Sequence, residues 1–115
     1  MKDKELFSVK NICDEFNITR KTLFYYDRVG LLKPSKRIGK QQSKFYDNQA
    51  KERLEMILVY RSAGLTIDEI RKIIDLNNKE QIVFALKEVK ARLIEESFEK
   101  EQEIKRIDLL IKMNS

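Results

Sequence analysis

Apolar residues at helical spacing mark two short helices near the start of the chain. The first is predicted over residues 8–16, with Ser8 as its N-cap and one apolar face formed by Val9, Ile12, Cys13 and Phe16. The pattern breaks at residues 17–18, and Thr19 can cap a second helix that stops near Gly30. Two short helices joined by a turn of about three residues are typical of a helix-turn-helix.

The middle of the chain predicts a hairpin followed by two more helices. Residues 36–46 alternate weakly around Gly39, which indicates a small β-hairpin with a basic tip. A third helix is expected to run from a cap at Asp47 to Gly64. The T-x-x-E capping box at residues 66–69 then starts a fourth helix, which is expected to end near residues 77–78.

The last third of the chain predicts one long helix. Residues 80–113 contain no Gly and no Pro, and their apolar residues recur in steps of three and four. The pattern weakens over residues 95–103, where Phe98 is the only large apolar side chain. On a lone helix this apolar seam would be exposed to water, so it needs a packing partner. A second copy of the chain is the simplest partner, although the helix could instead fold back on its own domain. The residues expected to form the dimer seam are Ile82, Leu86, Val89, Leu93, Ile104, Ile107 and Ile111.

Composition argues against most classes of enzyme and metal site. The 115 residues include no histidine, one cysteine and three glycines, which leaves no means to build a Ser-His-Asp triad, a His-containing metal site or a glycine-rich phosphate loop. No run of about 18 apolar residues predicts a membrane span, and the start MKDKELF lacks the apolar region of a secretory signal. We expect a cytoplasmic protein that is not an enzyme and needs no cofactor. Cys13 is interpreted as a buried structural thiol.

Positive charge is concentrated in the first 46 residues. The formal net charge is +5, yet residues 1–46 carry 11 Lys/Arg against 5 Asp/Glu, whereas residues 47–115 carry 13 against 14. Within residues 19–46 the ratio is 8 to 1, with Asp27 as the single acid. This local field predicts a docking face for a polyanion, and a merely solvated basic surface is the alternative.

The helix that begins at Thr19 carries side chains suited to a DNA groove. The second helix of a helix-turn-helix commonly enters the major groove with its first residues at base edges. Lys21, Tyr25 and Arg28 share one face, while Tyr26 turns to another side, where it either packs in the core or donates to a phosphate. The residues expected to contact DNA from this helix and the hairpin are Thr19, Arg20, Lys21, Tyr25, Tyr26, Arg28, Arg37, Lys40 and Lys44.

Three ordered stretches resemble one known family. The runs TLFYYDRVGLLKPSKR, KFY and SAGLTIDEIRKII resemble, in order and spacing, the winged-helix domain of the MerR family of bacterial transcription regulators. The resemblance implies DNA contacts from the second helix and the hairpin wing, including Tyr46, and an antiparallel coiled-coil dimer. It also implies bending or untwisting of promoter DNA so that RNA polymerase can engage. The chain departs from the family pattern at Phe24 and Lys44, where arginine is common.

Together these observations predict a mainly α protein. A winged helix-turn-helix DNA-binding domain with a small β-hairpin wing is expected over residues 1–78, followed by a coiled-coil dimerisation helix over residues 79–115. The expected function is sequence-specific transcription regulation by a homodimer on double-stranded DNA, with RNA polymerase as a further partner and no membrane. Because the chain stops with the long helix, no separate effector domain is expected. An architectural or excisionase-like DNA-binding protein is the alternative, and a coiled-coil adaptor that binds an acidic protein is a third interpretation.

Overall fold

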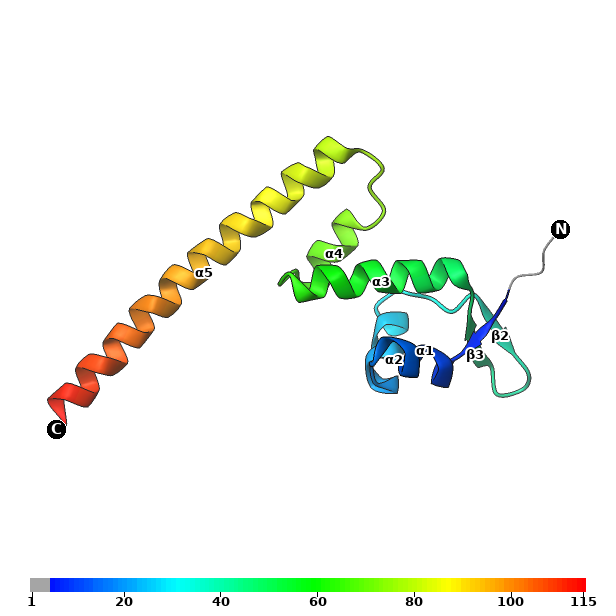
Figure 1. Ribbon diagram of the computed structural model, residues 1–115, viewed down its shortest axis with the longest axis horizontal. Helices are drawn as coiled ribbons and strands as arrows, with labels where there is room; N and C mark the ends of the chain where they lie inside the picture. The colour runs from blue at the N-terminus through cyan, green and yellow to red at the C-terminus, as the bar shows by residue number, and fades with distance from the viewer. Residues whose placement is uncertain (1–4) are drawn as a thin grey trace. The chain divides into compact units, whose positions relative to one another are not determined.

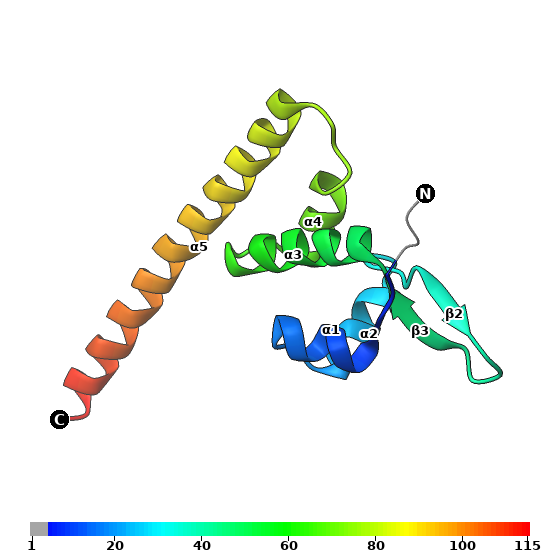
Figure 2. The same ribbon diagram turned by 45° about the vertical axis from the view of Figure 1, so that its right-hand side comes forward.

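The computed structural model describes residues 5–115, which form five helices and three short strands (Figures 1 and 2). They divide into two compact units, of which the first ends at Ile74 and the second spans Asp75–Ser115. The elements in chain order are β1 (Phe7–Ser8), α1 (Val9–Phe16), α2 (Arg20–Arg28), β2 (Lys36–Ile38), β3 (Ser43–Tyr46), α3 (Asn48–Ser62), α4 (Ile67–Ile73) and α5 (Lys79–Met113). The expected mainly α fold with a small hairpin is confirmed.

The helix-turn-helix forms where the capping residues predict it. Ser8 begins α1 with a capping box: its hydroxyl accepts from the Asn11 amide at 3.1 Å, and the Asn11 side chain accepts from the Ser8 amide at 3.2 Å. Asn17 ends α1 in the left-handed region, at φ 55°. Thr19 then begins α2 by accepting from the Thr22 amide at 3.1 Å. The turn between the helices is therefore fixed by its own side chains.

Gly30 terminates α2. Its φ of 76° is one that residues with a Cβ rarely adopt, and its amide donates to the carbonyl of Asp27 at 3.0 Å. The amide of Leu31 donates to the carbonyl of Tyr26 at 2.9 Å, which completes the hydrogen bonding of the helix end. This sharp exit directs Leu31 and Leu32 into the core, where each is 1% exposed.

The sheet is antiparallel and has the strand order β1-β3-β2. Strands β2 and β3 are the predicted hairpin, and the chain turns between Gly39 (φ 81°) and Gln42 (φ 55°), whose amide donates to the Gly39 carbonyl at 3.1 Å. Strand β1 was not predicted. Its two residues are too few to show an alternating pattern, and their pairing of Phe7 with Tyr46 depends on a segment 39 positions away.

Both helices that follow the hairpin begin at their predicted caps. The Asp47 carboxylate accepts from the Ala50 amide at 2.9 Å, and Thr66 and Glu69 form the predicted capping box. The predicted end of α4 near residues 77–78 is wrong, because the helix stops at Ile73. Asn78 instead caps α5, and its extended backbone at that position requires the chain to leave the helical conformation beforehand.

The core of the first unit is a compact set of apolar side chains from all its helices. Full burial of one such side chain contributes on the order of 1.5–3 kcal/mol, so this set dominates the stability of the unit. Its largest members, all below 2% exposure or close to it, are Ile12, Leu23, Leu31, Leu32, Tyr46, Leu54, Ile57, Leu65, Ile70 and Ile73. The exposed faces of α2 and the hairpin are thereby held on a rigid base.

The second unit is dominated by α5, an uninterrupted helix of 35 residues and thus about 52 Å long at 1.5 Å per residue. The seam residues in its second half are largely exposed: Ile104 at 60%, Ile107 at 55% and Ile111 at 61%. In its first half, Val89 is buried, and Ile82, Leu86 and Leu93 are partly buried. Among residues 5–115, no helix combines the length and apolarity needed to cross a bilayer.

Candidate nucleic-acid interface

The exposed face of α2 carries the cations that the sequence predicts. Arg20, Lys21 and Arg28 are exposed, and Tyr25 is exposed with its ring 5.4 Å from the guanidinium carbon of Arg28. The opposite face is formed by Leu23, Tyr26 and Asp27, which are all buried. The helix therefore presents three positive charges and one tyrosine hydroxyl outward over two and a half turns. Such a surface can donate both to phosphates and to base edges.

Thr19, a predicted contact residue, has a structural task that limits its free hydrogen-bonding capacity. Its hydroxyl accepts from the Thr22 amide and donates to the Thr22 hydroxyl, both at 3.1 Å. An N-cap residue of this kind fixes the direction of the first helical turn. Thr19 accordingly sets the position of Arg20 and Lys21, the next two residues, at the start of the helix.

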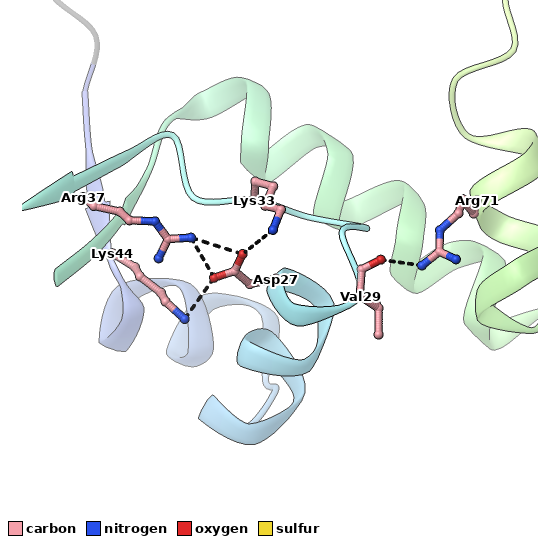
Figure 3. Close-up of polar contacts among 6 residues, drawn as sticks. All are labelled: Asp27, Val29, Lys33, Arg37, Lys44 and Arg71. Carbon is pink, nitrogen blue, oxygen red and sulfur yellow. Dashed lines mark hydrogen bonds and ion pairs between the residues drawn. The ribbon is translucent and has the colours of Figure 1, made fainter. Parts of the chain in front are cut away.

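Asp27, the acid inside the basic segment, is the centre of a cluster of three cations (Figure 3). Its carboxylate lies 3.3 Å from the Lys33 ammonium, 3.1 Å from an Arg37 guanidinium nitrogen and 3.0 Å from the Lys44 ammonium. The Asp27 side chain is 8% exposed, whereas that of Lys33 is 64% exposed. We call these four residues the Asp27 cluster. Two of the hairpin cations expected to reach DNA, Arg37 and Lys44, are thus held by one carboxylate.

The ionisation of Asp27 reflects two opposing effects. Burial raises the pKa of its carboxyl, but hydrogen bonds from Lys44, Arg37 and Lys33 outweigh burial and bring the pKa below the ordinary value of 3.8. The carboxylate is therefore ionised at neutral pH. The cluster as a whole keeps an excess of two positive charges, which remain available to an external anion.

Lys44 has a second contact that joins the two departures from the family pattern. Its ammonium lies 4.1 Å from the centre of the Phe24 ring, which suits a cation–π interaction. Phe24 thereby links the outer side of α2 to the hairpin. Lys40, by contrast, is exposed in the loop between β2 and β3, where no such partner restrains it among the described contacts.

Two tyrosines predicted as contacts are placed in the core. Tyr26 is 5% exposed and Tyr46 is 1% exposed, so as positioned neither ring offers a surface to a ligand. The Tyr46 hydroxyl has no hydrogen-bond partner among residues 5–115. Burial, followed by the charge of Asp27, raises the pKa of Tyr46 to about 12. Cys13 is only partly buried rather than fully buried as expected, and burial raises the pKa of its thiol.

Sequence reasoning missed Arg61, which extends the basic face of α2. This residue of α3 borders a shallow open depression of about 390 Å³ whose wall also includes Lys21, Tyr25 and Arg28. Arg61 is exposed, and its guanidinium is oriented by donation to the Leu65 carbonyl at 2.8 Å. In the sequence, Arg61 comes directly before the run SAGLTIDEIRKII, in the last turn of α3. Its proximity to α2 could be known only from the fold.

Lys33 was also missed, and Arg71 provides a further restraint on α2. Lys33 follows the C-terminus of α2 and belongs to the Asp27 cluster. The Arg71 guanidinium of α4 donates to the carbonyl of Val29, the C-cap of α2 (Figure 3). The C-terminal end of α2 is thus held by the hairpin through Asp27 and by α4 through Val29.

The fold and its basic face define the protein as a winged helix-turn-helix. The profile described as MerR HTH family regulatory protein matches residues 7–77, and that described as MerR, DNA binding matches residues 51–112. The chain therefore belongs to the MerR family of regulatory proteins.

Relatives in sequence and structure agree with this membership. The chain is 35% identical over 69 residues to the HTH-type transcriptional activator TipA of Streptomyces coelicolor. The matched stretch is 60% of this chain but only 27% of TipA. It resembles MtaN, the N-terminus of the Bacillus subtilis multidrug transporter activator, with a TM-score of 0.67 and 26% identity over 87% of this chain and 95% of that one. EcmrR, solved with DNA in EcmrR-RPo, matches with a TM-score of 0.63 and 26% identity, over 77% and 34% of the respective chains.

Proposed function

We propose that the chain is a sequence-specific transcription regulator that binds double-stranded promoter DNA as a homodimer. The observation that carries the proposal is the outward face of α2, where Arg20, Lys21 and Arg28 lie beside Tyr25 on a helix fixed at both ends. In this arrangement α2 enters the major groove and the hairpin wing follows the backbone on one side. Arg61 of α3 extends the phosphate contacts on another side of α2.

The proposed contact set follows from exposure. It keeps the predicted residues that are exposed, together with the partly buried Lys44, and adds Arg61 and Lys33, while Tyr26 and Tyr46 act as core residues and Thr19 as a cap. The proposed contacts are Arg20, Lys21, Tyr25, Arg28, Lys33, Arg37, Lys40, Lys44 and Arg61. The relationship to the EcmrR–DNA complex and to the activator TipA supports promoter DNA as the target and RNA polymerase as a further partner.

Dimerisation through residues 79–115 is proposed because α5 exposes its apolar seam. Ile104, Ile107 and Ile111 are each more than half exposed, and together with Phe98 at 61% they leave apolar area in water. Pairing with a second α5 covers this area and places two copies of α2 on one duplex. A dimer of this kind bends or untwists the promoter when both recognition helices engage half-sites that do not match their spacing.

Fluorescence anisotropy of the purified chain with labelled duplex from a random library, before and after rounds of selection, tests the proposal. A two-copy complex that contacts about six to ten phosphates should lose affinity by about 10³–10⁵ between 50 and 200 mM salt. Arg20→Ala combined with Lys21→Ala should abolish the increase in affinity for the selected duplex over the random library. Lys105→Ala combined with Arg106→Ala is the matched control, since it removes an adjacent Lys/Arg pair from exposed positions of α5.

The outcomes of this comparison are distinct. Binding that is saturable, salt-sensitive and lost only in the α2 variant supports a DNA regulator that uses this face. Equal losses in both variants would indicate attraction by net charge alone and would contradict a recognition role for α2. Absence of any duplex binding by the unaltered chain in dilute salt would end the proposal.

A further inference from the structure

A buried acid in the middle of a DNA-binding face is electrostatically unfavourable for binding a polyanion. Asp27 is the only acid in residues 19–46, and its negative charge reduces the attraction that the eight cations of this segment exert on a polyanion. The side chain is nevertheless 8% exposed and contacts three of those cations at 3.0–3.3 Å. Its benefit must therefore lie in something other than the attraction of DNA.

The three cations of the Asp27 cluster come from three different segments. Lys33 lies in the loop after α2, Arg37 in β2 and Lys44 in β3, whereas Asp27 itself lies in α2 (Figure 3). One carboxylate thus connects the recognition helix to both strands of the wing. Without it, three like charges would face one another at short range and would repel.

The outer strand of the wing has little else that ties it to the helices. All three residues of β2 are exposed, so hydrophobic burial does not hold this strand. It is hydrogen-bonded to β3, and β3 is anchored by β1 and by Tyr46 in the core. One guanidinium nitrogen of Arg37 donates to both carboxylate oxygens of Asp27, at 3.1 and 3.3 Å, and this contact runs from β2 directly to α2 among the described residues.

We propose that Asp27 is a positioning residue that fixes the wing against α2, so that the hairpin cations and the recognition helix meet the same duplex. The proposal deepens the proposed function and rests on it for the DNA readout. It carries a counterintuitive consequence: removing this acid makes the protein more positive, yet weakens DNA binding. If the local charge acted only by attracting DNA, removal of this acid would strengthen DNA binding instead.

The first arm of the test needs no DNA. Amide hydrogen exchange of the hairpin is compared in the full chain, in Asp27→Asn and in Arg37→Gln, which removes the β2 partner from an exposed strand. Both variants should lose exchange protection in β2 and β3 while α1 and α3 keep theirs. Lys36→Gln, a neighbouring exposed residue of the same strand, is the matched control and should leave the protection unchanged. Unaltered hairpin protection in Asp27→Asn would overturn the proposal.

The second arm measures DNA affinity against salt. Asp27→Asn is compared with Asp108→Asn, which makes the same change of charge at an exposed position of α5. Loss of one wing phosphate contact in each copy should reduce the steepness of the salt dependence by about 1.8, since each contact contributes about 0.9. Affinity in dilute salt should fall about tenfold or more in Asp27→Asn, and hardly change in Asp108→Asn.

The two arms separate failure of this inference from failure of the proposed function. If the unaltered chain binds duplex and Asp27→Asn binds it equally or more tightly with the same salt dependence, Asp27 does not position the wing for DNA. If the unaltered chain binds no duplex, the proposed function fails, and hydrogen exchange alone decides whether Asp27 fixes the hairpin. Loss of helical circular dichroism in a variant identifies a global loss of fold. If Asp27→Asn loses its fold, Arg37→Gln provides the deciding exchange measurement.

Discussion

Replacement of Tyr46 by phenylalanine should stabilise the protein, although tyrosine at this position belongs to the family pattern. The Tyr46 ring is 1% exposed, and its hydroxyl has no hydrogen-bond partner among residues 5–115. A buried hydroxyl without a partner costs about 1–3 kcal/mol of desolvation, which Tyr46→Phe removes while it keeps the ring packing. A gain of 1 kcal/mol corresponds to a rise of about 4–8 °C in the melting temperature of a unit of this size.

Tyr25→Phe is the matched control, because it deletes the same hydroxyl from an exposed ring. Tyr25 is 38% exposed on the outer face of α2. Thermal melts followed by circular dichroism should show a gain for Tyr46→Phe and no change for Tyr25→Phe. DNA affinity should show the reverse, with a loss only for Tyr25→Phe. A lower melting temperature for Tyr46→Phe, or a loss of DNA affinity equal to that of Tyr25→Phe, would refute the assignment of Tyr46 to the core.

Three further predictions concern the seam, acid stability and a helix cap. Ile107→Glu places a charge in the exposed seam of α5, and the chain should then sediment at micromolar concentration as single copies rather than pairs; continued pairing contradicts the assigned seam. Because the folded pKa of Asp27 lies below 3.8, its contribution to stability is complete above about pH 4 and is lost as the pH falls further, so urea melts should show a shallower acid loss in Asp27→Asn. Thr66→Ala removes the capping box of α4 and should cost about 1 kcal/mol in the same melts, whereas Thr66→Ser, which keeps the capping hydroxyl, serves as its control.

The elements that the sequence predicted correctly are those whose ends are set by residues close together in the chain. Ser8, Asp47 and Thr66 each accept from an amide three residues ahead, so the start of a helix is encoded within four residues. The end of α2 at Gly30 likewise needs only a residue that tolerates positive φ. Strand β1 was missed because its pairing with β3 is non-local. The early end of α4 was missed because Asn78 serves the next helix rather than the previous one.

The candidate site was predictable in composition but not in its internal contacts. An excess of cations over residues 19–46 shows in the sequence, and exposure of Arg20, Lys21 and Arg28 follows from helical spacing. Asp27 looked like an isolated exception within that run. Its burial and its partners Arg37 and Lys44 arise from packing of α2 against a hairpin that begins eight residues after the helix ends, and Lys33 comes from the loop between them. Along β3, Lys44 and Phe45 are both partly buried and only Tyr46 is buried, so no alternation in this short strand indicates that Tyr46 lies in the core.

Hydroxyl-radical protection of a duplex selected by the full chain tests the central claim most directly. If two copies of the basic face of α2 bind one duplex, the selected site is an inverted repeat. The two protected patches are then related by the two-fold axis of that repeat. Both patches should disappear together in the Arg20→Ala, Lys21→Ala variant and persist in the Lys105→Ala, Arg106→Ala control. A single unsymmetrical patch, or protection that survives the change in α2, would contradict the account.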